Sequence, residues 1–261
     1  MAPALLNTFR MNVGLYQAAA AMNANARWQE MISGNLAASA VPGFKKQEMS
    51  FAAIQAGLMP HGDVRNAGAP MPFALPGASP FTNFSGGELK ATGVGTNMAL
   101  EGPGFFQVQL PGGSTAYTRD GEFQLNAQGQ LATKQGYLVL GESGPIQFDL
   151  NNGAPISISP TGEISQGGEV KGTLKIGSFQ NASLLSPIGN GLFEDRDPSS
   201  KPGQGPKPTV RQGWIEAANT SATTEMANLI TAMRSFEANQ RVVQLHDERM
   251  GKVISELGNP N

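Results

Sequence analysis

The chain has 261 residues, of which 39% are hydrophobic and 15% charged, with 33 Gly, 18 Pro and no Cys. This composition favours turns and extended segments over an all-helical fold, and the lack of Cys excludes disulfides and thiolate chemistry. A net charge of −2 gives no electrostatic basis for binding nucleic acid or an anionic membrane. No apolar run reaches the ~20 residues of a membrane span, so we expect no membrane insertion, and we expect no cleavable signal peptide.

The first predicted element is an N-terminal helix within residues 1–43, which Pro42-Gly43 terminates. Its background is rich in Ala, and one seam repeats at alternating steps of four and three residues. The members of this seam are Met11, Leu15, Ala18, Met22, Asn25, Gln29, Ile32 and Leu36. We interpret the basic pair Lys45-Lys46 that follows as a solvated helix end.

Residues 44–93 are predicted to form an extended connection. Pro and Gly are so dense between residues 57 and 87 that we expect no regular element there. The prolines are Pro60, Pro70, Pro72, Pro76 and Pro80. Phe73, Phe81 and Phe84 leave two interpretations open, a passive linker or a segment that orders against a partner.

Residues 94–216 read as a β-rich body, because short β-runs alternate with turn signals. The runs include Phe105–Val108, Thr115–Tyr117, Glu122–Leu125, Gln130–Thr133 and Tyr137–Leu140. We interpret Phe105-Phe106 as core, and Arg119-Asp120 as an ion pair that braces a hairpin.

Residues 217–261 are predicted to form a long C-terminal helix. Its most apolar seam contains Met226, Leu229, Met233, Phe236, Gln240, Val243, Asp247, Met250, Ile254 and Leu257. Seams at both ends of a chain can bury each other by folding back, so we predict an antiparallel, coiled-coil-like pair and an α+β fold. Neighbouring apolar residues make the stripe too wide for one partner helix. Phe236 could contact another subunit or only anchor the intrachain pair.

Candidates for catalysis or metal binding are weak. His61 and His246 have no acidic or Cys neighbours at metal-ligand spacing, so we expect solvated side chains, no cofactor and no metal. Glu194, Asp195 and Asp197 suggest a calcium loop, but the sixth position from Asp195 is Ser and the twelfth is Pro.

Four groups of residues resemble, in order and spacing, the flagellar basal-body rod and hook family. They are Asn35-Leu36-Ala37 with Gly43-Phe44-Lys45, Gly102-Pro-Gly104-Phe105-Phe106, Tyr117-Thr118-Arg119-Asp-Gly121, and Phe236-Glu237-Ala-Asn239. Within the family the chain looks most like the rod members FlgF and FlgG, with a slight lean to the proximal-rod FlgF type.

The resemblance implies a structural axial protein without enzymatic activity, whose terminal helices polymerise into the tubular rod in the periplasmic space. It implies copies of itself, other rod and hook proteins and the flagellar type III export apparatus as partners. The alternative is a secreted β-rich binding or carbohydrate-active module that its terminal helices dimerise.

Overall fold

A computed structural model describes residues 2–61, 68–196, 203 and 205–258. The chain divides into two compact units. The helical unit comprises Met1–Leu36, Gln47–Phe81 and Thr223–Asn261, and the β unit comprises Ala37–Lys46 and Thr82–Ala222. Side chains are described from residue 14 onward, except at residues 54–74, 76, 197–202, 204 and 256–261.

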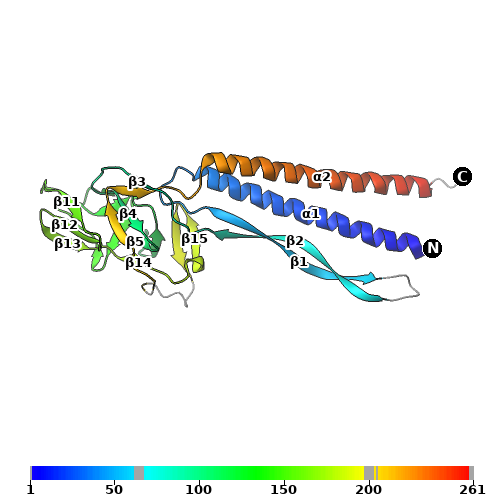
Figure 1. Ribbon diagram of the computed structural model, residues 1–261, viewed down its shortest axis with the longest axis horizontal. Coiled ribbons are helices and arrows are strands. Elements are labelled where there is room, and N and C mark those ends of the chain that lie inside the picture. The colour runs from blue at the N-terminus through cyan, green and yellow to red at the C-terminus, as the bar shows by residue number, and fades with distance from the viewer. Residues whose placement is uncertain (1, 62–67, 197–202, 204, 259–261) are drawn as a thin grey trace. The chain divides into compact units, whose positions relative to one another are not determined.

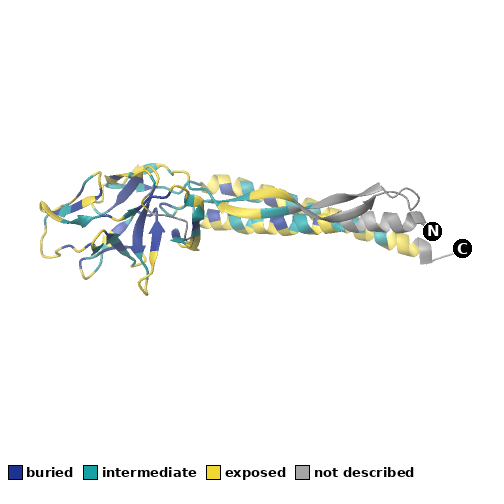
Figure 2. Ribbon diagram, turned by 90° about the horizontal axis from the view of Figure 1, so that it is seen from below, coloured by how far each residue is buried: buried dark blue, intermediate teal, exposed yellow. Residues whose placement is uncertain are grey.

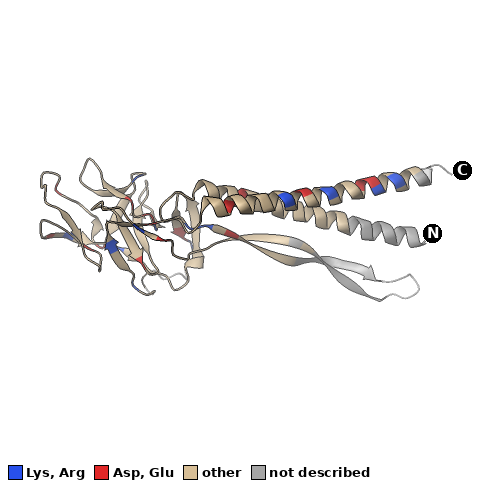
Figure 3. Ribbon diagram, turned by 45° about the horizontal axis from the view of Figure 1, so that its top comes forward, with Lys and Arg blue, Asp and Glu red and all other residues tan. Residues whose placement is uncertain are grey.

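The helical unit contains α1 (Ala2–Ala37), α2 (Ala222–Gly258) and a two-stranded sheet of β1 (Gln47–His61) and β2 (Gly68–Thr82). The two helices run antiparallel, so that both termini lie at the same end of the unit, and α1 lies between α2 and the sheet (Figures 1 and 3). This arrangement confirms the α+β class and the antiparallel helical pair. Neither helix has, among its described residues, a segment apolar enough to cross a membrane.

The β1–β2 sheet corrects the expectation that residues 57–87 hold no regular element. A two-stranded sheet leaves one edge of each strand unpaired, and Pro is tolerated where its missing N–H would face that edge. Pro70, Pro72, Pro76 and Pro80 all have even numbers. In a regular strand, residues of one parity direct their backbone nitrogens to the same edge, so all four can lie on the unpaired one. The prediction was wrong because it counted prolines without asking whether they occupy alternate positions along one strand.

The β unit consists of antiparallel strands joined by short turns. Its first strands are β3 (Leu89–Ala91), β4 (Met98–Glu101), β5 (Phe105–Gln109), β6 (Thr115–Thr118), β7 (Phe123–Leu125), β8 (Leu131–Thr133), β9 (Leu138–Gly141) and β10 (Gly144–Pro145). The others are β11 (Ile156–Ile158), β12 (Glu163–Gln166), β13 (Glu169–Thr173), β14 (Ile176–Gly177), β15 (Leu185–Gly189), β16 (Leu192–Asp195), β17 (Thr209–Gln212) and β18 (Trp214–Glu216), with a 3₁₀ turn at Ala182–Leu184.

The largest sheet runs in the order β15-β16-β6-β5-β9-β8-β7, with β10 on β9 and β14 on β5. Strands β11, β12 and β13 form a second sheet, and β17 pairs with β4 and β18 with β3. The last two pairs place β17 and β18, the final strands of the β unit, beside its first strands β4 and β3. They therefore place residues just before α2 beside the strands that follow the β1–β2 sheet.

Two hydrophobic clusters fill the β unit, and β5 contributes to both. Phe106 lies in the larger cluster with Met98, Val108, Val139 and other aliphatic residues, whereas Phe105 lies in a smaller aromatic cluster. Consecutive strand residues point to opposite faces, which explains this division. The prediction that Phe105-Phe106 is core is confirmed, since both are buried. Figure 2 shows that buried segments are concentrated in the strands of the β unit.

Candidate assembly surface on α2 and the Glu216 junction

The predicted seam of α1 is packed wherever the structure describes its side chains. Ala18, Asn25 and Ile32 are buried, and Leu15, Met22, Gln29 and Leu36 are half-buried. A second partner lies on the sheet side, where Trp28 meets Phe51 of β1 edge to face at 5.6 Å. Asn35 also exchanges hydrogen bonds with the backbone of Gln47, donating to its carbonyl and accepting from its N–H. The side chain of Met11 lies outside the described residues.

The packed seam of α2 differs from the predicted one at every second position. Leu229, Phe236, Val243 and Met250 belong to both seams and are half-buried. Between them, however, the less exposed positions are Glu225, Ala232, Asn239 and His246, in place of Met226, Met233, Gln240 and Asp247. Phe236 therefore lies on the intrachain seam. The observed seam is less apolar than the predicted one.

The composition of α1 explains which seam of α2 packs. A side chain at Gly14 would place its Cβ 3.2 Å from Nε2 of His246, so the two helices approach closely at this point. Nδ1 of His246 is buried, which corrects the expectation of a solvated histidine. Because α1 has the small residues Gly14, Ala18 and Ala21 on or beside its seam, its partner can approach with Ala232 and polar side chains, and the long methionines stay outside.

Three of the predicted pairing residues are consequently exposed. Met226 is 54% exposed, Met233 50% and Ile254 68%, together with Ile230 at 54%. The side chain of Leu257 lies outside the described residues. These side chains lie off the packed seam of α2, so the prediction that they pair with α1 is wrong. A contact with another subunit stays a prediction for them.

A buried ionic junction in the β unit centres on Glu216, at the end of β18. Lys45 Nζ donates to Glu216 Oε1 at 2.5 Å and Arg119 Nη1 donates to Oε2 at 3.1 Å. All three side chains are at most 7% exposed. Arg119 also donates to the carbonyls of Leu100 and Gly102, and its guanidinium lies 5.4 Å from the centre of the Phe105 ring.

This junction corrects two expectations. Lys45 is not a solvated helix end but a buried ion-pair partner, and Arg119 pairs with Glu216 rather than with its neighbour Asp120. Asp120 instead accepts a hydrogen bond from the backbone N–H of Glu122. Burial raises the pKa of Asp120 to about 6. Burial also lowers the pKa of Lys45 and of Arg119, against the opposing effect of the Glu216 carboxylate.

The junction holds together the three segments of the β unit from which the chain continues into the helical unit. The N–H of Gly43 donates to the Glu216 carbonyl at 2.7 Å, and the N–H of Gly87 donates to its carboxylate at 2.8 Å. Asn219 accepts from the N–H of Lys46 and donates to the carbonyls of Asn83 and Ser85. Segments 43–46, 83–88 and 216–219 are therefore fixed to one another by backbone hydrogen bonds.

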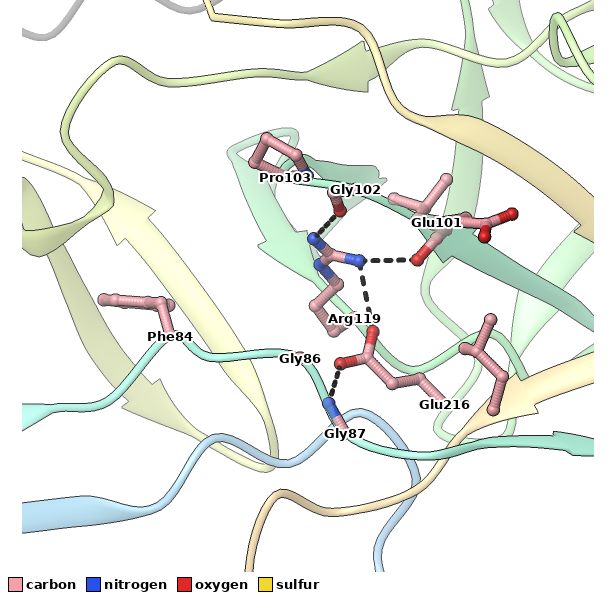
Figure 4. Close-up of a pocket in the computed structure, with 10 residues that line it drawn as sticks. Phe84, Gly86, Gly87, Glu101, Gly102, Pro103, Arg119 and Glu216 are labelled. Carbon is pink, nitrogen blue, oxygen red and sulfur yellow. Dashed lines mark hydrogen bonds and ion pairs between the residues drawn. The ribbon is translucent and has the colours of Figure 1, made fainter.

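A pocket of about 380 Å³ lies beside the junction (Figure 4). Its walls include Phe84, Gly86, Gly102, Pro103 and Arg119. Figure 4 shows that Arg119 and Glu216 point toward each other. The Arg119 guanidinium donates hydrogen bonds to the Glu216 carboxylate and to the carbonyls of Leu100 and Gly102. This arrangement orders loops, since Arg119 and Glu216 pair with each other and Glu101, which also lines the pocket, pairs with Arg211. The described residues contain no group of three His, Cys, Asp or Glu side chains that could hold a metal.

Most family-motif residues gather around this junction. Gly43 has φ +67°, and a Cβ there would lie 2.2 Å from the Arg119 backbone, while one at Gly121 would lie 1.6 Å from the Met98 carbonyl oxygen. Only Gly fits such contacts. The remaining motif members have packing roles in the β unit, contribute to the junction, or lie on the helices. The Phe44 carbonyl accepts a hydrogen bond from the Asn219 N–H, and Gly104 (φ +151°) approaches Pro208. Tyr117 packs with Phe179, and the Thr118 hydroxyl donates to the Gly191 carbonyl. On α2, Glu237 is exposed and Asn239 lies on the packed seam.

Glu216 and Asn219 are central to the junction, but the sequence alone did not single them out as interacting residues. Glu216 is a lone carboxylate at the end of a β-run, and its partners lie 171 and 97 positions away. Charged residues are almost never fully buried unless they are paired. Only the fold, or an alignment, could connect these three positions.

Comparison with known proteins assigns this architecture. Residues 99–166 match the family model for the flagellar hook protein FlgE/F/G D1 domain, and residues 211–256 match that for the flagellar basal body rod FlgEFG protein C-terminal region. The flagellar basal-body rod protein FlgG of Buchnera aphidicola (Schizaphis graminum) is 32% identical over 241 residues, covering 87% of this chain and 92% of the relative. This chain belongs to the flagellar basal-body rod protein family.

A FlgF- or FlgG-like rod component is the class that these relatives share, and it displaces the alternative of a secreted binding or carbohydrate-active module. Two proteins of Caulobacter vibrioides allow a direct comparison. Its FlgG is 30% identical over 256 residues, covering 90% of this chain and 96% of FlgG, and its FlgF is 27% identical over 237 residues, covering 89% and 92%. The two identities are similar, so they support a FlgF/FlgG-like rod component, and the expected lean to FlgF stays a prediction.

Proposed function

We propose that this chain polymerises through α1 and α2 into the flagellar rod, with copies of itself and other rod and hook proteins as neighbours. The observation that carries the proposal is the exposed apolar row of Met226, Ile230 and Met233 on a helix whose other face is already packed. Apolar side chains at this exposure gain stability when a neighbouring subunit removes them from water. The chain acts as a structural element without catalysis, because its buried charged groups serve to order loops.

The same proposal covers delivery and location. Subunits of a rod that crosses the periplasmic space have to reach its growing end. We propose that the flagellar type III export apparatus supplies this chain, and that the apolar surface of α2 is covered only after the subunit reaches its neighbours. The family membership and the exposed apolar row of α2 support this order of events.

The proposal can be tested by placing charge on the exposed row. In cells whose only copy carries Met226→Asp and Met233→Asp, we expect no complete rod and no swimming, because two buried carboxylates would oppose subunit packing. The purified variant should keep the near-ultraviolet circular dichroism of the folded β unit. The matched control is Gln240→Asp with Gln244→Asp, two exposed polar positions of α2, which should swim. Normal swimming by the methionine variant would overturn the proposal.

A further inference from the structure

The first half of α2 is apolar on only one flank of its packed seam. The seam positions there are 225, 229, 232 and 236, and each residue that follows a seam position turns by about 100° to one side. On that flank lie Met226, Ile230 and Met233, all at least half exposed. The opposite flank, formed by residues that precede a seam position, is small and polar. Its members are Thr224, Asn228, Thr231 and Ser235.

The second half of α2 reverses this pattern. Its seam positions are 239, 243, 246 and 250. The flank that follows the seam is now polar, with Gln240, Gln244, Asp247 and Gly251, all exposed. The flank that precedes the seam carries Val242, Leu245 and, one turn beyond the last seam position, Val253, which are 42%, 56% and 44% exposed.

Apart from Ile254, which is 68% exposed on the flank that follows the seam, the exposed apolar side chains of α2 form two stripes, on opposite flanks of the packed seam and at different heights. We name Met226, Ile230 and Met233 the early stripe, and Val242, Leu245 and Val253 the late stripe. Both stripes border the seam that packs on α1, so each extends an existing helix interface. A single partner helix cannot cover both, because they lie on opposite flanks of the packed seam and at different levels along α2.

One charged residue belongs to each row. Glu237 continues the early stripe by one turn, and Arg249 stands within the late stripe between Leu245 and Val253. The two rows are thus complementary to each other, apolar against apolar with opposite charges. Neither row is complementary to itself, because two early stripes would oppose Glu237 to Glu237 and two late stripes would oppose Arg249 to Arg249 wherever those residues meet.

We propose that the early stripe of one copy packs against the late stripe of the next copy. The inference rests on the proposed polymerisation and adds the pair of surfaces through which it takes place. Two different surfaces of one chain that bind each other make a head-to-tail contact, which extends into a filament when it does not close into a ring. The register that opposes Glu237 to Arg249 also opposes Ile230 to Val242 and Met233 to Leu245, so successive parallel helices are displaced by 12 residues, or roughly 18 Å along their length.

The size of the stripes fits a contact that forms only in the polymer. Three side chains, each about half exposed, cover far less than the ~800 Å² per partner of a stable protein interface. Two copies alone therefore bind weakly through one such contact. A copy inside the array uses both stripes at once, which stabilises it in place.

Cysteine cross-linking tests the pairing directly, because the chain has no Cys of its own. Cells without the wild-type chain would produce two variants together, Ile230→Cys with an epitope tag and Val242→Cys without one. Basal bodies isolated from them are oxidised and separated on non-reducing gels. We expect a mixed dimer at least tenfold more abundant than either dimer of identical variants. Met233→Cys with Leu245→Cys is the second pair in the same register, in case the first assembles poorly.

Thr231→Cys with Val242→Cys is the matched control, since Thr231 is exposed and adjacent to Ile230 but lies on the other flank. We expect it to give less than a tenth of the mixed dimer. A dominant dimer of two Ile230→Cys chains, equal cross-linking by the Thr231 control, or no cross-link in assembled rods would overturn the pairing. These outcomes are distinct from failure of the proposed function, which would appear as normal swimming of the Met226→Asp and Met233→Asp variant.

Discussion

The β unit and the helical unit bury apolar side chains to very different extents. In the β unit, Met98, Phe106 and Val139 are fully buried, and its junction satisfies even the charges of Lys45, Arg119 and Glu216. In α2, Met226, Ile230 and Met233 are at least half exposed. The β unit completes its core within one chain, whereas α2 keeps an exposed apolar row, which the proposed polymerisation would cover. One chain thus contains a unit with a complete hydrophobic core and a unit with an exposed apolar row.

Removing the negative charge of Glu216 should reduce the stability of the β unit more than the other substitutions proposed below. Glu216→Gln keeps the shape of the side chain but leaves Lys45 and Arg119 buried without an anion. We expect the β unit to lose about 3 to 5 kcal/mol of unfolding free energy. Urea unfolding in a Trp28→Phe background, followed by Trp214 fluorescence, measures the β unit alone. Glu101→Gln is the control, since its pair with Arg211 is about half exposed and should contribute less than ~1 kcal/mol.

The close contact at Gly121 provides the next largest effect. Gly121→Ala would place its Cβ 1.6 Å from the Met98 carbonyl oxygen, so the segment between β6 and β7 that contains Gly121 must move. We expect a loss of about 3 kcal/mol by the same fluorescence assay. Gly153→Ala is matched in chemistry, with nothing within 4 Å of the new Cβ, and should be nearly neutral. Equal stability of the two variants would show that the β unit is less tightly packed than the comparison requires.

The sequence was most informative where local periodicity decides the structure. Helices at both ends, their antiparallel pairing and the strand runs from Phe105 to Leu140 follow from spacing and turn residues, and the structure confirms them. Periodicity chose the wrong intrachain seam of α2, however, because Met233 ranks above Ala232 in hydrophobicity. The choice depends on how closely α1 can approach, and Gly14 decides this from more than 200 residues away.

The Glu216 junction could not be predicted for a related reason. Lys45, Arg119 and Glu216 are each surrounded by residues typical of turns or strands, and nothing local marks them as buried. Their burial depends on long-range contacts: the Gly43 N–H donates to the Glu216 carbonyl, and Arg119 donates to the carbonyls of Leu100 and Gly102. The motif glycines Gly43 and Gly121 were visible in the sequence, but the backbone contacts that require them were not.

The contact between Gly14 and His246 allows the helical unit to be tested separately. Gly14→Leu would force α2 away from α1, because even a Cβ meets the His246 ring at 3.2 Å. We expect the helical pair to lose about 1 to 3 kcal/mol, measured by thermal unfolding at 222 nm. Gly34→Leu is the matched control, with open space around its Cβ, and should gain up to ~1 kcal/mol through higher helix propensity. Trp214 fluorescence of both variants should stay unchanged.

The smallest effect concerns Asp120, which makes the β unit sensitive to pH. Burial raises the pKa of Asp120 to about 6 from an ordinary value near 4, so the folded state favours the protonated carboxyl. The stability that this group contributes is complete below pH ~4 and is lost as the pH rises through 6. Asp120→Asn keeps an oxygen that can accept from the Glu122 N–H but cannot ionise. We therefore expect equal stability of variant and wild type at pH 4, and a gain of about 1 to 2 kcal/mol for the variant at pH 8. Urea unfolding by Trp214 fluorescence at the two pH values measures this difference. A variant that is no more stable than wild type at pH 8 would show that water reaches Asp120, and that the β unit is less completely closed than its core implies.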